Sequence, residues 1–297
     1  MTKRVLTIQD ISCIGKCSIT IAVPIISALG SEAVILPTAL LSAHSIFEGY
    51  TFKDLSDQIE PITSHWKKEG VRFDAIYTGY LGTIDQIDQV KKIFADFREA
   101  GTLIFVDPAM ADSGRLYPGF DMAYARKNAE LCGAADIIVP NITEAAIMTD
   151  MEYRRDEDQD EKYIREMLSR LAELGARINV ITGVSLERGR TGVMGLDTVT
   201  GEYYIYQNDK VDAVFHGTGD LFSSTCVGEM MRGRSWRNAM KLASQYTAHT
   251  IAVTMQDPDK PWYGVDFEAT IPDLVRAQDA AGDGNPFQTR ELHEYGI

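Results

Sequence analysis

The chain has 297 residues, of which 45% are hydrophobic and 24% are charged, a composition typical of a globular domain with a buried core. Its 43 Asp and Glu residues against 29 Lys and Arg residues give a net charge of −14 at pH 7. So acidic a surface repels phosphate backbones and anionic lipid, which excludes nucleic acid and membranes as expected partners. Any anionic ligand has to be held locally, by backbone amides, a few cations or a metal.

The N-terminal stretch MTKRVLTIQD lacks the apolar core of a signal peptide. No apolar run reaches the ~18 residues of a membrane span, so we expect a cytoplasmic protein. No CxxC pair occurs, and we expect the cysteines to be small buried thiols in a reducing compartment. They are Cys13, Cys17, Cys132 and Cys226.

Short apolar runs rich in β-branched residues alternate along the chain with longer segments of helical periodicity. The runs predict buried strands at 5–9, 33–36, 75–78, 103–106, 137–139 and 178–182. The periodic segments predict helices at 55–68, 85–100, 124–132 and 162–174. This alternation predicts an α/β fold with a mostly parallel sheet and helices on both of its faces.

The remaining segments complete this organisation. Residues 192–196 and 203–206 flank Thr200-Gly201 and predict a hairpin, and residues 220–252 have a helical pattern almost throughout. The charged stretch 152–161 (EYRRDEDQDE) predicts a solvated surface loop or helix start. Because no linker and no repeat divides the chain, we expect residues 1–297 to form a single domain.

Ligands of open α/β sheets bind beyond the carboxyl ends of the strands. Polar residues follow each expected strand, and we expect them to converge on one active site. They are Asp10 and Ser12, Ser42 and His44, Thr78-Gly79-Tyr80, Asp107-Pro108, Pro140-Asn141 and Thr182-Gly183.

The stretch FHGTGD (215–220) stands directly before a run with a helical pattern. A helix start leaves backbone N–H groups unpaired and carries partial positive charge, so it binds phosphate without a basic side chain. Glycines let that backbone approach an anion closely. Asp220 would repel phosphate, but it can accept a proton from a hydroxyl that attacks phosphorus. The pattern therefore predicts phosphoryl transfer to an alcohol; the alternative is that Asp220 only caps the helix.

The sequence GTGD-LFSS resembles the signature of ribokinase-like kinases. IQDISCIG, LLSAHSIFEGYTF, YTGYLG, VDPAMAD and DIIVPNITEA resemble successive segments of the pyridoxal (vitamin B6) kinase branch, in the same order and spacing. No GxxxxGK[ST] pattern occurs, which argues against a P-loop kinase. The resemblance implies a ribokinase-like three-layer sandwich and ATP-dependent phosphorylation of the 5′-hydroxymethyl group of pyridoxal, pyridoxine or pyridoxamine. It also implies Mg²⁺ and a homodimer, and it raises a dependence on K⁺ that no residue pattern tests.

By the same resemblance, Asp220 is the base, and Gly217, Thr218 and Gly219 form the anion hole that also holds the ATP phosphates. Asp107 is expected near the phosphates and their metal, and Asn141 and Glu144 in a metal–water and phosphate network. Asp107 and Glu144 are thus expected to hold Mg²⁺ through water, and Thr182 to contact the nucleotide. Structural alternatives exist, because Asp107 can cap a turn before Pro108 and Asn141-x-x-Glu144 is close to a helix capping box.

The expected vitamin pocket is formed by residues that follow the first three strands. Ser42, His44 and Ser45 in LLSAHS are similar to the family's FSNHT stretch, and Tyr80 is similar to its ring-stacking tyrosine. A histidine beside small polar residues suits a pyridine that carries a phenolic oxygen. Asp10 and Ser12 complete this set. The other histidines are not spaced as metal ligands and are assigned no role: His65, His216, His249 and His293.

Two departures from the family pattern lie in this pocket. Asp10-Ile11 stands where Ser-His usually follows the glutamine, and Ala43 replaces the asparagine of FSNHT. The transfer chemistry is therefore better supported than the substrate. Two alternatives stay open: a hydroxymethylpyrimidine kinase of the same superfamily, and a nucleotide- or vitamin-binding sensor without turnover. The intact Asp220 argues against the sensor, because binding alone needs no base.

Overall fold

The computed structural model describes residues 2–278 and 285–287. In these ranges the helices are α1 (Ile19–Ala28), α2 (Ser56–Lys68), α3 (Ile84–Phe97), α4 (Met122–Gly133), α5 (Ile142–Met148), α6 (Glu161–Ala172), α7 (Thr218–Met231), α8 (Trp236–Gln256) and α9 (Phe267–Ala277), with a short 3₁₀ helix at Asp156–Asp158. The strands are β1 (Arg4–Ser12), β2 (Glu32–Leu41), β3 (Phe52–Asp54), β4 (Ala75–Thr78), β5 (Leu103–Val106), β6 (Ala111–Asp112), β7 (Arg115–Leu116), β8 (Ile137–Ile138), β9 (Ile178–Val184), β10 (Arg190–Asp197) and β11 (Glu202–Asp209).

The main sheet has the strand order β11-β10-β9-β8-β5-β4-β1-β2-β3. Its pairings are parallel from β9 through to β2 and antiparallel at both edges, where β10, β11 and β3 pair. Strand β1 has β2 on one side and β4 on the other. The direction in which successive strands are added to the sheet therefore reverses beside β1. Such a reversal opens a crevice at the carboxyl ends of the strands, where ligands of these sheets bind.

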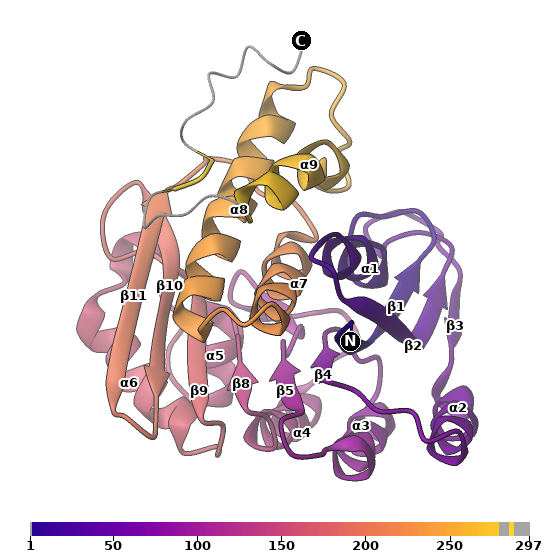
Figure 1. Ribbon diagram of the computed structural model, residues 1–297. Helices are drawn as coiled ribbons and strands as arrows, with labels where there is room; N and C mark the ends of the chain where they lie inside the picture. Colours follow the sequence, from indigo (N-terminus) through magenta and orange to yellow (C-terminus); the bar gives the residue numbers. More distant parts are fainter. Residues whose placement is uncertain (1, 279–284, 288–297) are drawn as a thin grey trace.

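Helices cover both faces of the sheet (Figure 1), with α1, α7, α8 and α9 on one face and α2 to α6 on the other. Alternate residues of each central strand enter different cores. In β4, Ile76 packs with the α2–α6 layer, whereas Tyr77 packs with α1, α7 and α8. The predicted three-layer α/β fold is confirmed.

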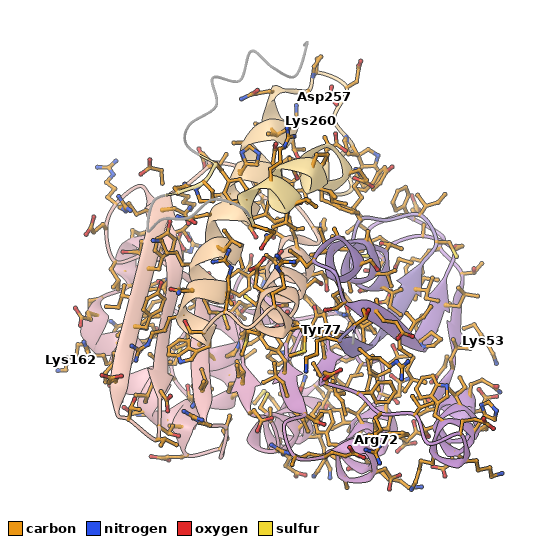
Figure 2. All side chains as sticks on the ribbon, in the orientation of Figure 1. Lys53, Arg72, Tyr77, Lys162, Asp257 and Lys260 are labelled. Carbon is orange, nitrogen blue, oxygen red and sulfur yellow. The ribbon has the colours of Figure 1, made fainter. Side chains whose placement is uncertain are left out.

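Tyr77 lies near the centre of the molecule, and the labelled charged side chains Lys53, Arg72, Lys162 and Lys260 lie at its periphery (Figure 2). The tyrosine is fully buried and meets the ring of Phe105 edge-on, with centroids 5.7 Å apart. Burial raises the pKa of its hydroxyl well above the ordinary value, so this side chain stays neutral beneath the site.

The six expected strands, the four expected helices and the 192–206 hairpin are all present. The long C-terminal helical pattern is interrupted, because residues 232–235 separate α7 from α8. The charged stretch 152–161 forms a mostly exposed loop with the short 3₁₀ helix and the first residue of α6, as predicted. The single-domain assignment for 1–297 stays a prediction, and His293 lies outside the described residues.

Several elements differ from the expectation. Helices α1 and α9, strand β3 and the small β6–β7 hairpin were not predicted, and α5 was indicated only by the possible capping box at Asn141. Helix α1 (ITIAVPIISA) carries no polar stripe, because both the sheet and α7 cover it, and its sequence therefore lacks the periodicity of an amphipathic helix. Strands β1 and β9 run further than expected, so Asp10, Ser12 and Gly183 lie within the ends of strands rather than after them.

All four cysteines are free, but Cys13 is exposed, so the prediction that all four are buried is wrong for this residue. Its amide donates to the carbonyl of Leu41, directly beyond the last residue of β1, and the thiol is left at the surface. No helix in the described ranges combines the length and the apolar character that crossing a membrane requires.

Candidate active site

A cavity of ≈ 410 Å³ opens at the carboxyl ends of the central strands, a volume in the range that holds a small ligand. Its walls come from the β10–β11 hairpin, the segment 208–213, the start of α7 and one side of α8. One end is lined by carboxyl groups, from Asp107, Glu144 and Asp220. Neutral side chains of the hairpin and of α8, such as Val193, Ala248 and Ile251, line the walls elsewhere.

The glycine turn of FHGTGD closes the acidic end. Gly217 is the N-cap of α7, has a left-handed φ of 81° and makes no side-chain cap hydrogen bond. Asp220 is the third residue of the helix and not its cap, so the capping-only interpretation is wrong. The first amides of a helix have no intrahelical acceptor. The turn therefore presents free N–H donors and a positive helix end to the cavity.

The two glycines of this turn have different surroundings. A Cβ on Gly217 would lie 1.9 Å from the backbone oxygen of Lys16, so the turn is packed directly on the segment that precedes α1. A Cβ on Gly219 would meet no protein atom within 4 Å and would enter the cavity instead. Gly217 is thus required by the fold, whereas the space beside Gly219 is free for a ligand.

The carboxyl group of Asp220 has its pKa raised to about 7, first by burial and then by the negative charges of Asp107 and Asp10. A hydrogen bond from the backbone amide of Ser18 lowers the pKa and offsets part of this effect. A general base works best when its pKa lies near the working pH. The position and the acidity of Asp220 therefore both suit proton abstraction.

Ser18 was not singled out in the sequence, yet it connects two of the expected site residues. Its amide bonds to Asp220, and its side chain bonds to Asp10. The residue has a φ of 49° at the start of α1, a left-handed conformation that costs energy outside glycine. No pattern in the sequence signals this, because the role comes from a backbone angle.

Asp107, Asn141 and Glu144 lie together at the acidic end. Asp107 accepts hydrogen bonds from the Ser223 hydroxyl (2.7 Å) and the Ala109 amide (3.2 Å). Asn141 and Glu144 form a complete capping box on α5. The other Glu144 oxygen accepts from the amide of Met110 (2.9 Å), so Glu144 also fixes the turn that follows Asp107. The capping and cavity-lining readings hold at once.

Burial raises the pKa values of both Asp107 and Glu144, and the charge of Asp107 raises that of Glu144 further. Carboxyl groups gathered in one buried cavity are what a hydrated Mg²⁺ ion takes, together with the phosphates of a substrate. These residues fit such an ion. Thr182 and Gly183 line the cavity beside Asn141, with which Thr182 forms an isolated β-bridge.

None of the expected vitamin residues is among the described lining residues of the cavity. Asp10 is buried, accepts from the Ser12 hydroxyl (2.9 Å), and has its pKa raised by burial. Tyr80 stacks with Phe120, at 5.5 Å between ring centroids, and the charge of Asp10 adds to the effect of burial in raising the pKa of Tyr80 to about 12.

The loop after β2 carries the remaining three expected residues. His44 Nδ1 accepts from the Ile46 amide (3.2 Å), and burial, with His216, lowers the pKa of His44 to about 4. The imidazole is therefore neutral, with its proton on Nε2. The exposed Ser42 accepts from the Thr51 amide (2.8 Å) and so closes the loop. Ser45 is also exposed and lies beside His44 in the chain.

Other lining residues were missing from the sequence interpretation. They include His216, Lys210, Tyr117 and residues of α8 such as Ser244 and Thr247. His216 stands next to the glycine turn in the chain, and that adjacency was the available signal. The others come from elements that only the folded chain brings to the cavity.

Comparison with known proteins agrees with this geometry. The family model described as phosphomethylpyrimidine kinase matches residues 26–260. The chain belongs to this family. A Bordetella avium protein named pyridoxine/pyridoxal/pyridoxamine kinase is 28% identical over 84% of the chain and 85% of that protein. The resemblance to the pyridoxal kinases of the ribokinase-like superfamily is thereby confirmed, and the chain is a kinase that acts on an alcohol group.

Two solved structures extend the similarity. A putative phosphomethylpyrimidine kinase from Bacteroides thetaiotaomicron, crystallised with pyridoxal, is 33% identical with a TM-score of 0.88, over 96% of this chain and 99% of that chain. A pyridoxal kinase from Lactobacillus plantarum is 27% identical with a TM-score of 0.85, over 94% and 98% of the two chains.

Asp220→Asn keeps the shape of the side chain but cannot accept a proton. We expect kcat to fall by ~10²–10⁴-fold with ligand binding largely preserved. The pKa of Asp220 in the folded chain, about 7, lies above its pKa in the unfolded chain. Ionisation of this group therefore lowers the free energy of unfolding as the pH rises from the unfolded pKa to the folded pKa. The variant should therefore unfold at a higher temperature than the parent at pH 8, and this difference should shrink towards pH 4. A parental kcat in steady-state assays would contradict the catalytic assignment.

Gly219→Ala places a methyl group where the transferring phosphate would lie. We expect an unchanged unfolding temperature and a loss of about 10²–10³-fold in kcat, as for the removal of one oxyanion donor. Gly217→Ala is the contrast, because its methyl group would collide with the Lys16 carbonyl and should lower the unfolding temperature. Equal activity of Gly219→Ala and the parent would mean that this turn does not face the phosphate.

Glu144→Gln introduces an amide that cannot accept all the N–H donors that surround the carboxylate. We expect more Mg²⁺ to be needed for half-maximal rate, partial rescue by excess Mg²⁺, and a lower unfolding temperature. Thr83→Ala, which removes the cap of α3, is a matched control for the loss of a helix cap by ~1 kcal/mol. If both variants keep the Mg²⁺ dependence of the parent, Glu144 is only structural.

Proposed function

We propose that this chain transfers the γ-phosphoryl group of ATP to the 5′-hydroxymethyl group of pyridoxal, pyridoxine or pyridoxamine. The observation that carries the proposal is Asp220, a partly buried base with a pKa raised to about 7, set directly behind the glycine turn of α7. Residues similar to the vitamin pocket of pyridoxal kinases lie near it, because Asp10 acts on its pKa and His44 contacts the ring of His216. The names of the relatives and the pyridoxal in the Bacteroides structure support the B6 substrate class.

In the proposed reaction, Asp220 accepts the proton of the substrate hydroxyl. The hydroxyl oxygen bonds to the γ-phosphorus as the bond from the γ-phosphorus to ADP breaks and ADP leaves. The amides of Gly217, Thr218 and Gly219 donate hydrogen bonds to the oxygens of the transferring phosphoryl group. The N-terminal end of α7 stabilises the negative charge of these oxygens. Thr182 and the β10–β11 hairpin hold the nucleotide. This division assigns the cavity to ATP and the loops after β1 and β2 to the vitamin.

Asp107, Glu144 and, through the cap of α5, Asn141 would hold a hydrated Mg²⁺ ion at the acidic end. Bound there, the ion would neutralise phosphate charge and orient the phosphates. The chain itself fixes Glu144 with backbone donors and Asp107 with the Ser223 hydroxyl. Both carboxyl groups are therefore held in place before a ligand enters.

On the vitamin side, Asp10 and Ser12 would bind polar groups of the substrate, and Tyr80 would stack on the ring. The neutral His44 offers an Nε2–H donor that suits the phenolic oxygen. Ser42 and Ser45 would shape the rim of the pocket. The departures at Asp10 and Ala43 lie in this part of the site, and they are where selection among the three vitamers would be decided.

We also propose that the protein is a cytoplasmic homodimer, as the family resemblance implies. The dependence of its activity on K⁺ can be measured in the same assay. The β2–β3 edge supports an assembly, because Ile35, Leu40 and Phe52 are 43%, 43% and 49% exposed there. Exposed apolar side chains at a sheet edge are typical of a surface that pairs with another chain.

The test measures ADP release with Mg-ATP and each B6 vitamer, side by side with hydroxymethylpyrimidine. We expect turnover of at least one vitamer, with hydroxymethylpyrimidine the poorer acceptor. The family model is described by a pyrimidine substrate, so turnover of hydroxymethylpyrimidine alone would make that the function. Vitamer binding without ADP release would instead favour a sensor.

A further inference from the structure

The cavity proposed for ATP is lined by an excess of negative charge. Its described lining contains five carboxyl side chains, from Asp107, Asp112, Glu144, Asp209 and Asp220. In the same lining, only Lys210 and His216 can carry a positive charge. Lys210 forms an ion pair with Asp156 at 2.6 Å, outside the cavity lining. His216 is thus a lining side chain that can offer an N–H donor to a bound polyphosphate.

His216 stands at the junction of the two halves of the site. It lines the nucleotide cavity, and its ring lies 4.9 Å from the ring of His44 on the vitamin side. It directly precedes Gly217, whose backbone is held against Lys16. The start of its side chain is therefore fixed by the same packing that fixes the glycine turn.

The two imidazoles have different environments. His44 is partly buried, uses Nδ1 to accept a backbone amide, and stays neutral because burial and the neighbouring His216 lower its pKa to about 4. His216 is exposed to the cavity. Between the two rings, His216 is the one whose N–H groups can reach an anion in that cavity.

We propose that His216 is a further catalytic residue, which donates an N–H to the γ-phosphoryl group as this group passes from ATP to the acceptor. The proposal rests on the proposed function for the direction of transfer. It gives the two histidines separate partners, with His44 facing the vitamin and His216 the phosphoryl group. No covalent bond to His216 is formed.

The test compares the binding of ADP and of the non-hydrolysable imido analogue of ATP, by calorimetry, to the full-length parent and to His216→Phe. Phenylalanine keeps a ring against His44 and removes the N–H groups. We expect the imido analogue to bind about tenfold more weakly and ADP to be unchanged, since only the former has a γ-phosphoryl group. The kcat should fall with little change in the vitamer KM, and His216→Lys should recover part of both losses.

His65→Phe is the matched control, because His65 lies exposed on α2 away from the cavity, and it should leave all these values unchanged. Equal weakening of ADP and the imido analogue, or no weakening of either, would overturn the proposal. So would a rise confined to the vitamer KM, which would place His216 on the vitamin. The nucleotide comparison needs no turnover, so a parent that fails to phosphorylate any vitamer would refute the proposed function alone.

Discussion

The arrangement of the site depends on the free-energy cost of burying carboxyl groups in one region of the fold. Asp10, Asp107, Glu144 and Asp220 come from four separate segments and meet at the carboxyl ends of the sheet. Burial raises the pKa of each of them, and neighbouring carboxyl charge adds to the effect at Glu144 and Asp220. Such a cluster is costly in an empty site. It is tolerated because backbone amides and hydroxyl groups donate hydrogen bonds to the carboxyl oxygens.

That constraint explains why the site is built from backbone rather than from basic side chains. Lysines placed at the acidic end would pair with the carboxyl groups and remove the base that the reaction needs. Two helix starts, those of α1 and α7, supply positive potential instead, and Ser18 connects them to Asp10 and Asp220. A helix end stabilises negative charge without titrating. The strained φ of Ser18 is a local cost of this arrangement.

The sides proposed for the nucleotide and for the vitamin share few residues, and this separation has a structural origin. The cavity is lined mainly by β9, β10, β11, α7 and α8, whereas Asp10 lies near the end of β1, and His44 and Tyr80 follow β2 and β4. The strand order separates the two groups, because β9, β10 and β11 form one end of the sheet and β1, β2 and β4 lie towards the other end. Substrate preference can therefore vary through the loops after β1 and β2 while the transfer chemistry is kept.

The sequence by itself determined the α/β class, the central strands, the amphipathic helices and the family, because those signals are local. Short apolar runs predict strands, and the FHGTGD stretch and the other quoted segments carry the family resemblance. The same local reasoning recognised the Asn141–Glu144 capping box. It failed at α1, which is apolar on all sides, and at the extended ends of β1 and β9.

Only the tertiary structure decided which residues meet. The sequence left open that Asp220 is only a helix cap. The structure excludes this interpretation, because Gly217 occupies the N-cap position in a left-handed conformation. The strained Ser18, the tether from Glu144 to Met110 and the approach of His216 to His44 join segments far apart in the chain. Electrostatic shifts follow distance and burial, which the order of residues does not record. The raised pKa of Asp220 is therefore a consequence of the fold.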